Sequence, residues 1–401
     1  MTVSSPRKPV PRGLAHSGPI ILAYGFRPFF LGAGIWAITA MGLWIGALAA
    51  GIPIGGSYGG PAWHAHEMLF GYTSATLAGF LLTAIPNWTG RLPVSGTPLA
   101  ILFAVWVAGR LALIAPDVIG LPFAIAIDSA FLPLLLAVCL REIVAGKKWR
   151  DLKVLAGLAA LGLANIGFHA LIVWGDDPTM ASRLAIAAYI MLIGIVGGRI
   201  VPSFTRNWLA KRHIISLPAP YDRLDTIALL GNLPALALWV ALPEHGLTAI
   251  AAFMAALLHF WRLGRWQGWQ TGAERLVLVL HLAYLFVPLG FLAIALVPMG
   301  WLDPASALHV FTVGAIGLMT LAVMSRATRG HTGLPLTAPW STALSYALLF
   351  AAAILRPNAM LMPELYMRLI ELSGLCWILA FALYVGEYAP AILGRRKPRP
   401  E

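Results

Sequence analysis

Two histidines and a glutamate, His64, His66 and Glu67, stand within four positions where a long apolar stretch of the chain begins. Five further histidines lie in or just beyond comparable stretches: His169, His259, His281, His309 and His331. Hydrocarbon offers no hydrogen-bond partner, so an imidazole at membrane depth is costly and usually marks a functional site. Neutral imidazole suits copper, iron and zinc, and no thiolate or carboxylate cluster accompanies these residues to favour structural zinc or calcium. The histidines therefore predict haem or copper binding.

Each of these histidines also has a plainer interpretation, which is a hydrogen bond between helices. His259 is the weakest metal candidate because it is close to Trp261 and Arg262, residues typical of a membrane interface. In an α-helix the rings of His64 and His66 stand about 200° apart, so they would serve different centres on opposite faces. At a frayed helix start the two could instead converge on one ion.

The elements that hold these residues are predicted to be membrane spans. Hydrophobic residues make up 59% of the 401 residues and charged residues 11%, and the mean hydropathy is +0.80, whereas about a quarter of a soluble protein is charged. The short, turn-rich connections leave no room for a soluble domain, so we expect one helical domain over 24–390, between an N-terminal segment 1–23 and a basic tail 391–401. Windows of about 20 apolar residues predict an all-α integral membrane protein with about twelve transmembrane helices: 27–50, 65–86, 98–115, 121–141, 154–174, 182–201, 224–242, 246–261, 276–297, 305–325, 341–356 and 363–388.

The basic residues occur mainly in alternate loops, although the formal net charge is +12. The positive-inside rule places these loops and both termini in the cytoplasm. This distribution does not indicate nucleic-acid binding. The first helix is too long for the apolar part of a signal peptide, so we expect no cleaved signal. The basic segments are 7–12, 91, 141–153, 206–223, 262–275, 326–329 and 395–399.

This orientation gives each polar residue a depth in the membrane. One group falls in the outer part of its helices and could meet there: His64, His66, Glu67, His169 and His309. His259 and His281 fall in the inner part, and His331 falls in a cytoplasmic loop. A second, inner group is therefore possible.

Charged residues inside the predicted helices need partners or functions. Arg110 and Asp128 lie at similar depth in neighbouring helices, so we predict a buried ion pair. Glu371 has no partner near it in the sequence and, like Glu67, is a candidate for carrying protons. Three arginines are candidates for binding haem propionates or lipid headgroups, although the positive-inside rule also accounts for them: Arg199, Arg326 and Arg329.

The second, sixth and tenth predicted helices end in related sequences, at 85–91, 197–206 and 326–333. His66 precedes Gly90 by the same number of residues by which His309 precedes Gly333. This spacing suggests three repeats of four helices. Such repeats would place the three helices in equivalent inner positions.

Five blocks of the sequence closely resemble the NnrS family. The family is described as bacterial inner-membrane proteins of about twelve helices that contain haem and copper and are linked to nitric oxide and to denitrification or nitrosative stress. The resemblance implies the same location, cofactors and role here. The blocks are FRPFF at 26–30, WHAHEMLFGY at 63–72, GFLLTAIPNWTGR at 79–91, GGRIVPSFTRNWL at 197–209 and LHVFTVGAIGLMTLAVMSRATRGHTGLPL at 308–336. Motif matching carries over His64, His66, Glu67, His281, His309 and His331, with His169 a weaker match.

Together these observations predict a redox metalloprotein that handles nitric oxide or a metal–nitrosyl species at a buried, His-ligated haem of b type, with copper as a partner or in a separate site. If it reduces nitric oxide, electrons must come from a quinol or a cytochrome, because the chain has no haem c motif and no flavin or nucleotide fingerprint. Two alternatives stay open. One is a transporter of a metal or metal–nitrosyl complex, and the other is a non-catalytic haem-based sensor or assembly factor.

Overall fold

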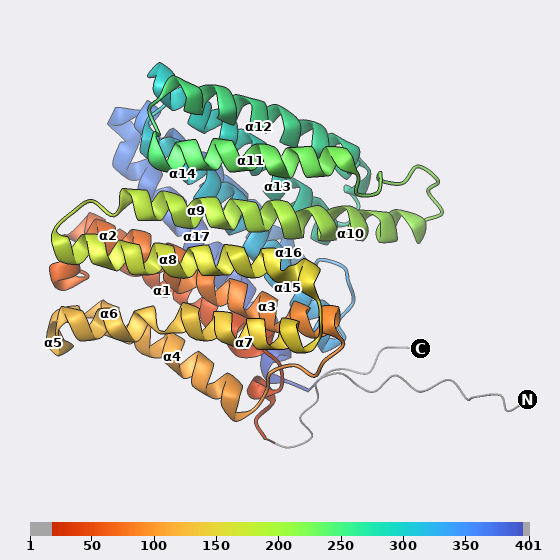
Figure 1. Ribbon diagram of the computed structural model, residues 1–401, viewed down its shortest axis with the longest axis horizontal. Helices are drawn as coiled ribbons and strands as arrows, with labels where there is room; N and C mark the ends of the chain where they lie inside the picture. Colours follow the sequence, from red (N-terminus) through yellow and green to blue (C-terminus); the bar gives the residue numbers. More distant parts are fainter. Residues whose placement is uncertain (1–17, 396–401) are drawn as a thin grey trace, which may run out of the picture.

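The computed structural model describes residues 18–395, which form a bundle of twelve helical spans (Figure 1). The predicted all-α membrane fold is confirmed, because each span is long and apolar enough to cross a bilayer. Most of the predicted N-terminal segment 1–23 and part of the tail 391–401 lie outside the described residues. The spans, numbered 1 to 12, are Phe26–Ala50, Gly60–Thr89, Thr97–Ile114, Leu121–Ala145, Trp149–Trp174, Thr179–Ala210, Arg223–Ala241, Gly246–Arg265, Arg275–Met299, Pro304–Thr332, Trp340–Leu361 and Pro363–Leu393.

Several spans consist of more than one helical element, and no strand occurs between residues 18 and 395. Short 3₁₀ turns lie at Ile20–Leu22, Gly56–Tyr58, Trp149–Asp151, Gly268–Thr271, Val297–Met299, Ala359–Leu361 and Pro363–Leu365. The α-helices are α1 (Phe26–Ala50), α2 (Gly60–His66), α3 (Thr73–Thr89), α4 (Thr97–Ile114), α5 (Pro116–Ile119), α6 (Leu121–Ser129), α7 (Phe131–Ala145), α8 (Leu152–Trp174), α9 (Thr179–Leu192), α10 (Gly198–Ala210), α11 (Arg223–Ala241), α12 (Gly246–Arg265), α13 (Arg275–Leu296), α14 (Pro304–His309), α15 (Leu318–Thr332), α16 (Trp340–Asn358) and α17 (Tyr366–Leu393).

Three spans are interrupted by a π-helical segment, and these are spans 2, 6 and 10. The segments are η3 (Glu67–Tyr72), η5 (Ile193–Gly197) and η8 (Val310–Gly317). A π-helical turn departs from the regular α-helical hydrogen bonding and is frequent at functional sites. The interruptions recur every four spans, in agreement with the predicted repeat.

The interrupted spans also lie inside the bundle. Within their apolar windows, 78%, 61% and 67% of the residues are buried, against 33–44% in most other spans. The predicted inner position of the three helices is therefore confirmed. Span 9, which contains α13, is a fourth inner span at 72% and was not predicted.

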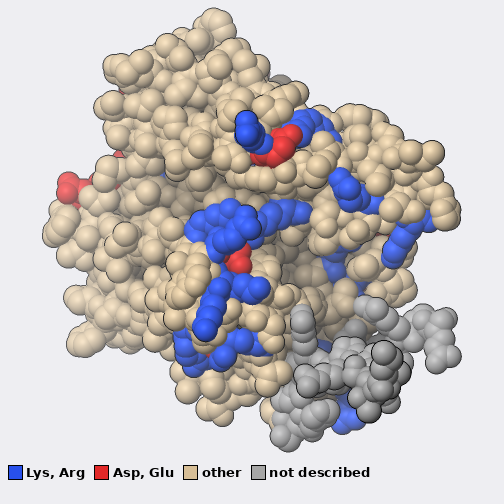
Figure 2. Space-filling view, turned by 45° about the vertical axis from the view of Figure 1, so that its right-hand side comes forward, with Lys and Arg blue, Asp and Glu red and all other residues tan. Residues whose placement is uncertain are grey.

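Basic side chains gather at one end of the bundle, which we call the basic end (Figure 2). This end lies on the right of Figure 1, where α10 ends. Spans 2 and 10 finish here at Gly90 and Gly333, whose φ angles of 76° and 81° allow glycine to end a helix in the left-handed conformation. The related sequences at the ends of spans 2 and 10 thus both contain a glycine that ends the helix.

Candidate functional site

A buried ionic network surrounds the start of η3. Arg110 on α4 donates from Nη1 to Glu67 Oε2 at 2.5 Å and from Nη2 to Asp128 on α6. All three side chains are buried. The predicted contact between Arg110 and Asp128 is confirmed, but the prediction of a simple pair was wrong, because the guanidinium bridges two carboxylates.

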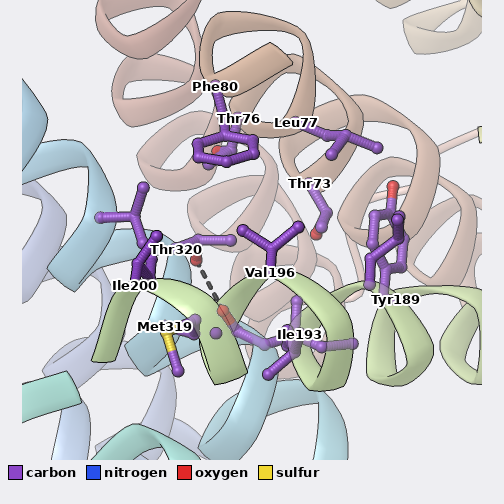
Figure 3. A pocket seen from close by; sticks show the side chains of 14 residues that line it. Thr73, Thr76, Leu77, Phe80, Tyr189, Ile193, Val196, Ile200, Met319 and Thr320 are labelled. Atoms are coloured by element: carbon purple, nitrogen blue, oxygen red, sulfur yellow. Dashed lines mark hydrogen bonds between the residues drawn. The ribbon is translucent and has the colours of Figure 1, made fainter. Parts of the chain in front are cut away.

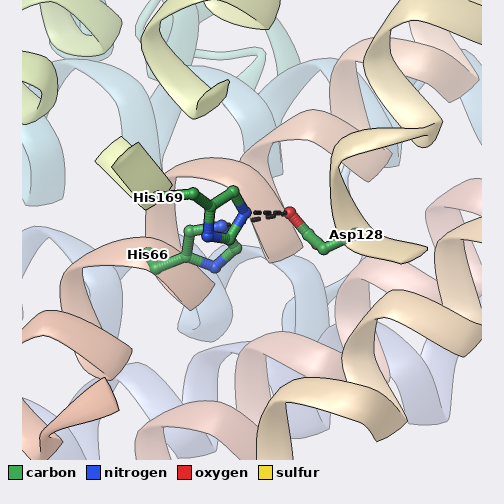
Figure 4. A group of neighbouring side chains, drawn as sticks. All are labelled: His66, Asp128 and His169. Carbon is green, nitrogen blue, oxygen red and sulfur yellow. Dashed lines mark hydrogen bonds and ion pairs between the residues drawn. The ribbon is translucent and has the colours of Figure 1, made fainter. Parts of the chain in front are cut away.

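Two of the candidate histidines belong to the same network (Figure 4). The ring of His66 lies 3.1 Å from Glu67 Oε1 through Nδ1 and 2.9 Å from Asn165 Oδ1 through Nε2. His169 on α8 contacts Asp128 Oδ2 at 2.9 Å through Nε2 and Tyr58 at 3.1 Å through Nδ1. Every ring nitrogen of the two histidines therefore has a partner.

His66, Asp128 and His169 could supply one metal ligand each, since their donor atoms lie within 4.8 Å of one another. A metal ion there would displace hydrogen bonds that are already formed, and it would lie beside the positive charge of Arg110, which contacts the same Asp128 carboxylate. As arranged, the cluster is better suited to join spans 2, 3, 4 and 5 than to bind a cation.

The two acidic candidates for proton transfer lie in different surroundings. Glu67 Oε2 also accepts a hydrogen bond from Trp36 Nε1 at 2.7 Å, so donors hold both oxygens of this carboxylate. Glu371 is half-buried on α17. A role in proton transfer stays a prediction for both residues.

Gly71 in η3 is required by this network. A Cβ atom at Gly71 would lie 2.5 Å from Arg110 Nη1 and 2.5 Å from Glu67 Oε2, whereas one at Gly167 on α8 would meet no atom within 4 Å. We expect Gly71→Ala to destabilise the protein by roughly 1–3 kcal/mol through overpacking. Gly167→Ala is the matched control and should be neutral or stabilising by about 0.5–1 kcal/mol. Thermal unfolding in detergent compares the two variants. Equal midpoints would mean that the close contact of Arg110 and Glu67 with residue 71 does not require glycine.

A second buried network holds η5. Arg262 on α12 donates to Asp225 Oδ1 at 2.8 Å and to the Gly194 carbonyl at 3.0 Å. His259 contacts Tyr284 at 2.7 Å and Asn232 at 2.6 Å. The plainer interpretation of His259, a hydrogen bond between helices, is therefore confirmed.

His64 and His309 line one cavity at the end of the bundle opposite the basic end, which we call the His64 cavity. It has an empty volume of about 1250 Å³, and its walls include Met41, Met68 and Arg356. His64 and His66 thus point to different surroundings, as their predicted angular separation requires. The ring of His64 stacks on Trp44 at 4.6 Å between centroids.

The polar atoms of the His64 cavity are arranged to receive a ligand. His309 Nδ1 lies 2.6 Å from the Ala305 carbonyl, so this nitrogen carries the proton and donates it, which leaves a lone pair on Nε2. His64 Nδ1 and Arg356 Nη1 are buried without a hydrogen-bond partner among residues 18–395. Buried polar groups are normally paired, so each such exception calls for an explanation.

A small central cavity lies between the three interrupted spans (Figure 3). Its walls come from 73–80 of α3, from 189–200 around η5 and from 316–323 of η8 and α15. It shares Thr73 and Ile316 with the His64 cavity. Spans 2, 6 and 10 therefore surround a space between them.

A third cavity, of about 900 Å³, lies near the basic end, and we call it the His331 cavity. His331 was predicted in a loop, and this was wrong: α15 continues to Thr332, because Gly333 supplies the stop, and the ring lies 5.3 Å from Tyr24. Arg326 lines the same cavity and lies 3.9 Å from the centre of the Phe204 ring.

The other candidates near the basic end are dispersed. His281 contacts Thr205 at 2.7 Å. Arg329 donates to the Pro335 carbonyl at 2.6 Å, and Arg199 pairs with Asp151 at 3.0 Å. The inner histidines do not form one group in the described residues, because His259, His281 and His331 have different partners.

Arg356 lines the His64 cavity but was not among the site residues predicted from the sequence. It lies in the predicted window 341–356, at the helix end opposite the basic end, where it resembled a loop charge. One feature of the sequence could have marked Arg356 as a candidate site residue: few basic residues occur on the non-cytoplasmic side of the predicted topology.

The fold and this site define a polytopic helical membrane protein with histidines along its inner helices. A family model described as NnrS protein matches residues 20–396. The chain belongs to the NnrS family, as predicted, which makes it a nitric-oxide-related membrane protein. No curated protein matches the chain.

Proposed function

We propose that the protein handles nitric oxide or a metal–nitrosyl species at a b-type haem held in the His64 cavity. The tautomer of His309 carries this proposal. Metal-binding histidines usually donate their other ring N–H to a carbonyl or carboxylate, which fixes the ring and raises its basicity. The contact between His309 Nδ1 and Ala305 has this form, and it leaves Nε2 available to bind iron.

The residues present fit the cofactor. The His64 cavity is lined by apolar side chains together with His64, His309 and Arg356, a few polar groups on a mainly apolar wall, as is usual for a cofactor site. His309 and His64 are the residues that would hold the haem iron, and the unpaired guanidinium nitrogen of Arg356 would suit a propionate. Haem iron supplies a site that binds nitric oxide and exchanges electrons. The protein's part is to orient the ring of His64 against Trp44 and to fix the tautomer of His309.

The residues best suited to bind copper line the same cavity. Met41 and Met68 line it together with His64, and thioether with imidazole suits Cu(I), so copper bound through His64 would be an alternative to haem there. The cluster of His66, His169 and Asp128 fits copper less well because its donors are already hydrogen-bonded.

We further propose that the basic end faces the cytoplasm of a bacterium, with the protein in the inner membrane. The His64 cavity then lies toward the outer face. Reduction of nitric oxide would draw its electrons from a quinol or a cytochrome.

The transporter alternative has less support. A path for a metal ion needs ligands or water along its length, and the central cavity presents an apolar wall, described below. The alternative of a haem-based sensor shares the site and differs only in showing no turnover.

The test is the reduced-minus-oxidised optical spectrum of wild-type protein purified from haem- and copper-supplied cells, with iron and copper determined per chain. We expect a haem spectrum that changes when nitric oxide is added. Folded protein without haem would contradict the proposal and favour transport. A haem spectrum without nitric oxide turnover, when a reductant is supplied, would favour the sensor.

Arg356→Met should have effects of opposite sign in the two forms of the protein. Without haem, the variant removes a half-buried cation whose buried Nη1 has no hydrogen-bond partner among the described residues, so the unfolding temperature should stay or rise. With haem, loss of a charge-assisted bond of about 1.5–3 kcal/mol should weaken haem binding at least about tenfold. Arg150→Met, at an exposed position of the basic end, is the control. Unchanged haem retention in Arg356→Met would exclude the propionate contact.

A further inference from the structure

The central cavity has an apolar wall even though four hydroxyl groups belong to it. Thr73 donates to the Met68 carbonyl at 2.7 Å, and Thr320 donates to the Ile316 carbonyl at 2.7 Å. Tyr189 donates to the Leu69 carbonyl at 2.8 Å. Thr76 donates likewise to the Tyr72 carbonyl. Because these hydroxyl groups donate their hydrogen bonds to backbone carbonyls, mainly methyl and ring carbons line the cavity.

Apolar cavities of this kind stay dry and take up small apolar molecules such as xenon. A water molecule needs two to four polar partners, which this wall does not offer. An ion would lose its hydration without compensation, and its transfer into such a place is far more costly than that of a neutral molecule.

The three cavities follow one another along the inner spans. The central cavity shares Thr73 and Ile316 with the His64 cavity. It shares Phe80, Ile200 and Val323 with the His331 cavity. Neighbouring cavities therefore have wall residues in common, and a rotamer change of these side chains is the motion that would connect them.

We propose that the central cavity is a binding site for small uncharged gas molecules, and that the three cavities form a passage for them between the two ends of the bundle. The gas site depends on the apolar wall alone. Its use to deliver nitric oxide to the His64 cavity rests on the proposed function. The passage excludes ions because the central cavity, the middle one of the three, offers them no ligand.

Xenon-pressurised crystals test the gas site without any cofactor. Val196 points into the cavity beside Thr73 and Thr320 (Figure 3), so Val196→Phe should fill it. Val173→Phe is the matched control, since Val173 is exposed on α8. We expect an anomalous xenon peak at the centre of spans 2, 6 and 10 in the wild type and in the control, and none in Val196→Phe. Absence of the peak in the wild type, or its persistence in Val196→Phe, would overturn the proposal.

A nearly isosteric variant keeps the test informative where Val196→Phe fails to fold. Val196→Cys is made with both native cysteines, Cys139 and Cys376, replaced by alanine. The reaction of the new thiol with neutral methyl methanethiosulfonate and with its trimethylammonium-ethyl analogue is measured, each relative to a free thiol. The neutral reagent should react at least about tenfold faster, because a charge is costly to bring into the cavity. Equal rates would mean a water-filled cavity and would overturn the proposal.

The two proposals can fail separately. Xenon in the central cavity of a protein that binds no haem would leave the gas site intact and remove the proposed function. Haem that responds to nitric oxide, in a protein without bound xenon, would do the reverse.

Discussion

Arg110→Ala should be the most destabilising single substitution in the ionic network, with a loss of about 3–5 kcal/mol, the usual cost of breaking a buried ion pair. The guanidinium contacts the carboxylates of both Glu67 and Asp128. Its removal leaves two buried negative charges near each other. Asp128→Ala should cost less, because Arg110 keeps its contact with Glu67.

The double variant Arg110→Ala/Asp128→Ala should be more stable than Arg110→Ala alone. It leaves one carboxylate, Glu67, which retains its hydrogen bonds to Trp36 and His66. Such non-additivity is the signature of residues in one network.

Thermal unfolding midpoints in detergent measure this order, and the yield of folded protein supports it. Arg141→Ala is the control, because Arg141 is largely exposed in its pair with Glu142, and exposed pairs contribute about 0–1 kcal/mol. An Arg110→Ala midpoint equal to that of Arg141→Ala would refute the bridging role.

His309→Ala should abolish haem binding and, with it, resistance of the host cell to nitric oxide. The variant removes the ring whose Nε2 is left free by the Ala305 contact, and no other ring in the His64 cavity has a tautomer fixed in this way. His64→Ala should leave at most a site that binds haem more weakly and gives an altered haem spectrum.

Haem content, iron and copper per chain and growth under nitric oxide are measured for both variants. His213→Asn is the control, because His213 is exposed in a loop with a φ of 59°, which asparagine tolerates. A third variant, His169→Ala, separates the two histidine clusters. Loss of haem in His169→Ala combined with retention in His309→Ala would place the cofactor in the ionic network instead.

The twelve spans could be predicted because hydropathy and length are local properties of the chain. The separation of His64 from His66 could be predicted as well, because helix periodicity alone directs neighbouring rings to opposite faces. The ends were harder to predict. Span 6 ends at Ala210, beyond its apolar window, since polar residues continue this helix outside the hydrocarbon. Span 2 begins at Gly60, before its window, because Pro61 suits the first turn of a helix.

The contacts of the site could not be predicted in full because they join distant parts of the chain. The partners of Arg110 lie 43 and 18 residues away, and no periodicity indicates that a guanidinium bridges both. The π-helical segments were likewise unexpected, although Gly71 and Gly314 in two of them occupy matching places in the repeat. The cavities depend on how spans 2, 6 and 10 pack.

The most direct test of the central claim is to locate iron in the haem-loaded protein by anomalous diffraction at the iron absorption edge. We expect one iron position in the His64 cavity, within bonding distance of His309 Nε2. Iron at the cluster of His66, His169 and Asp128, or in the His331 cavity, would contradict it.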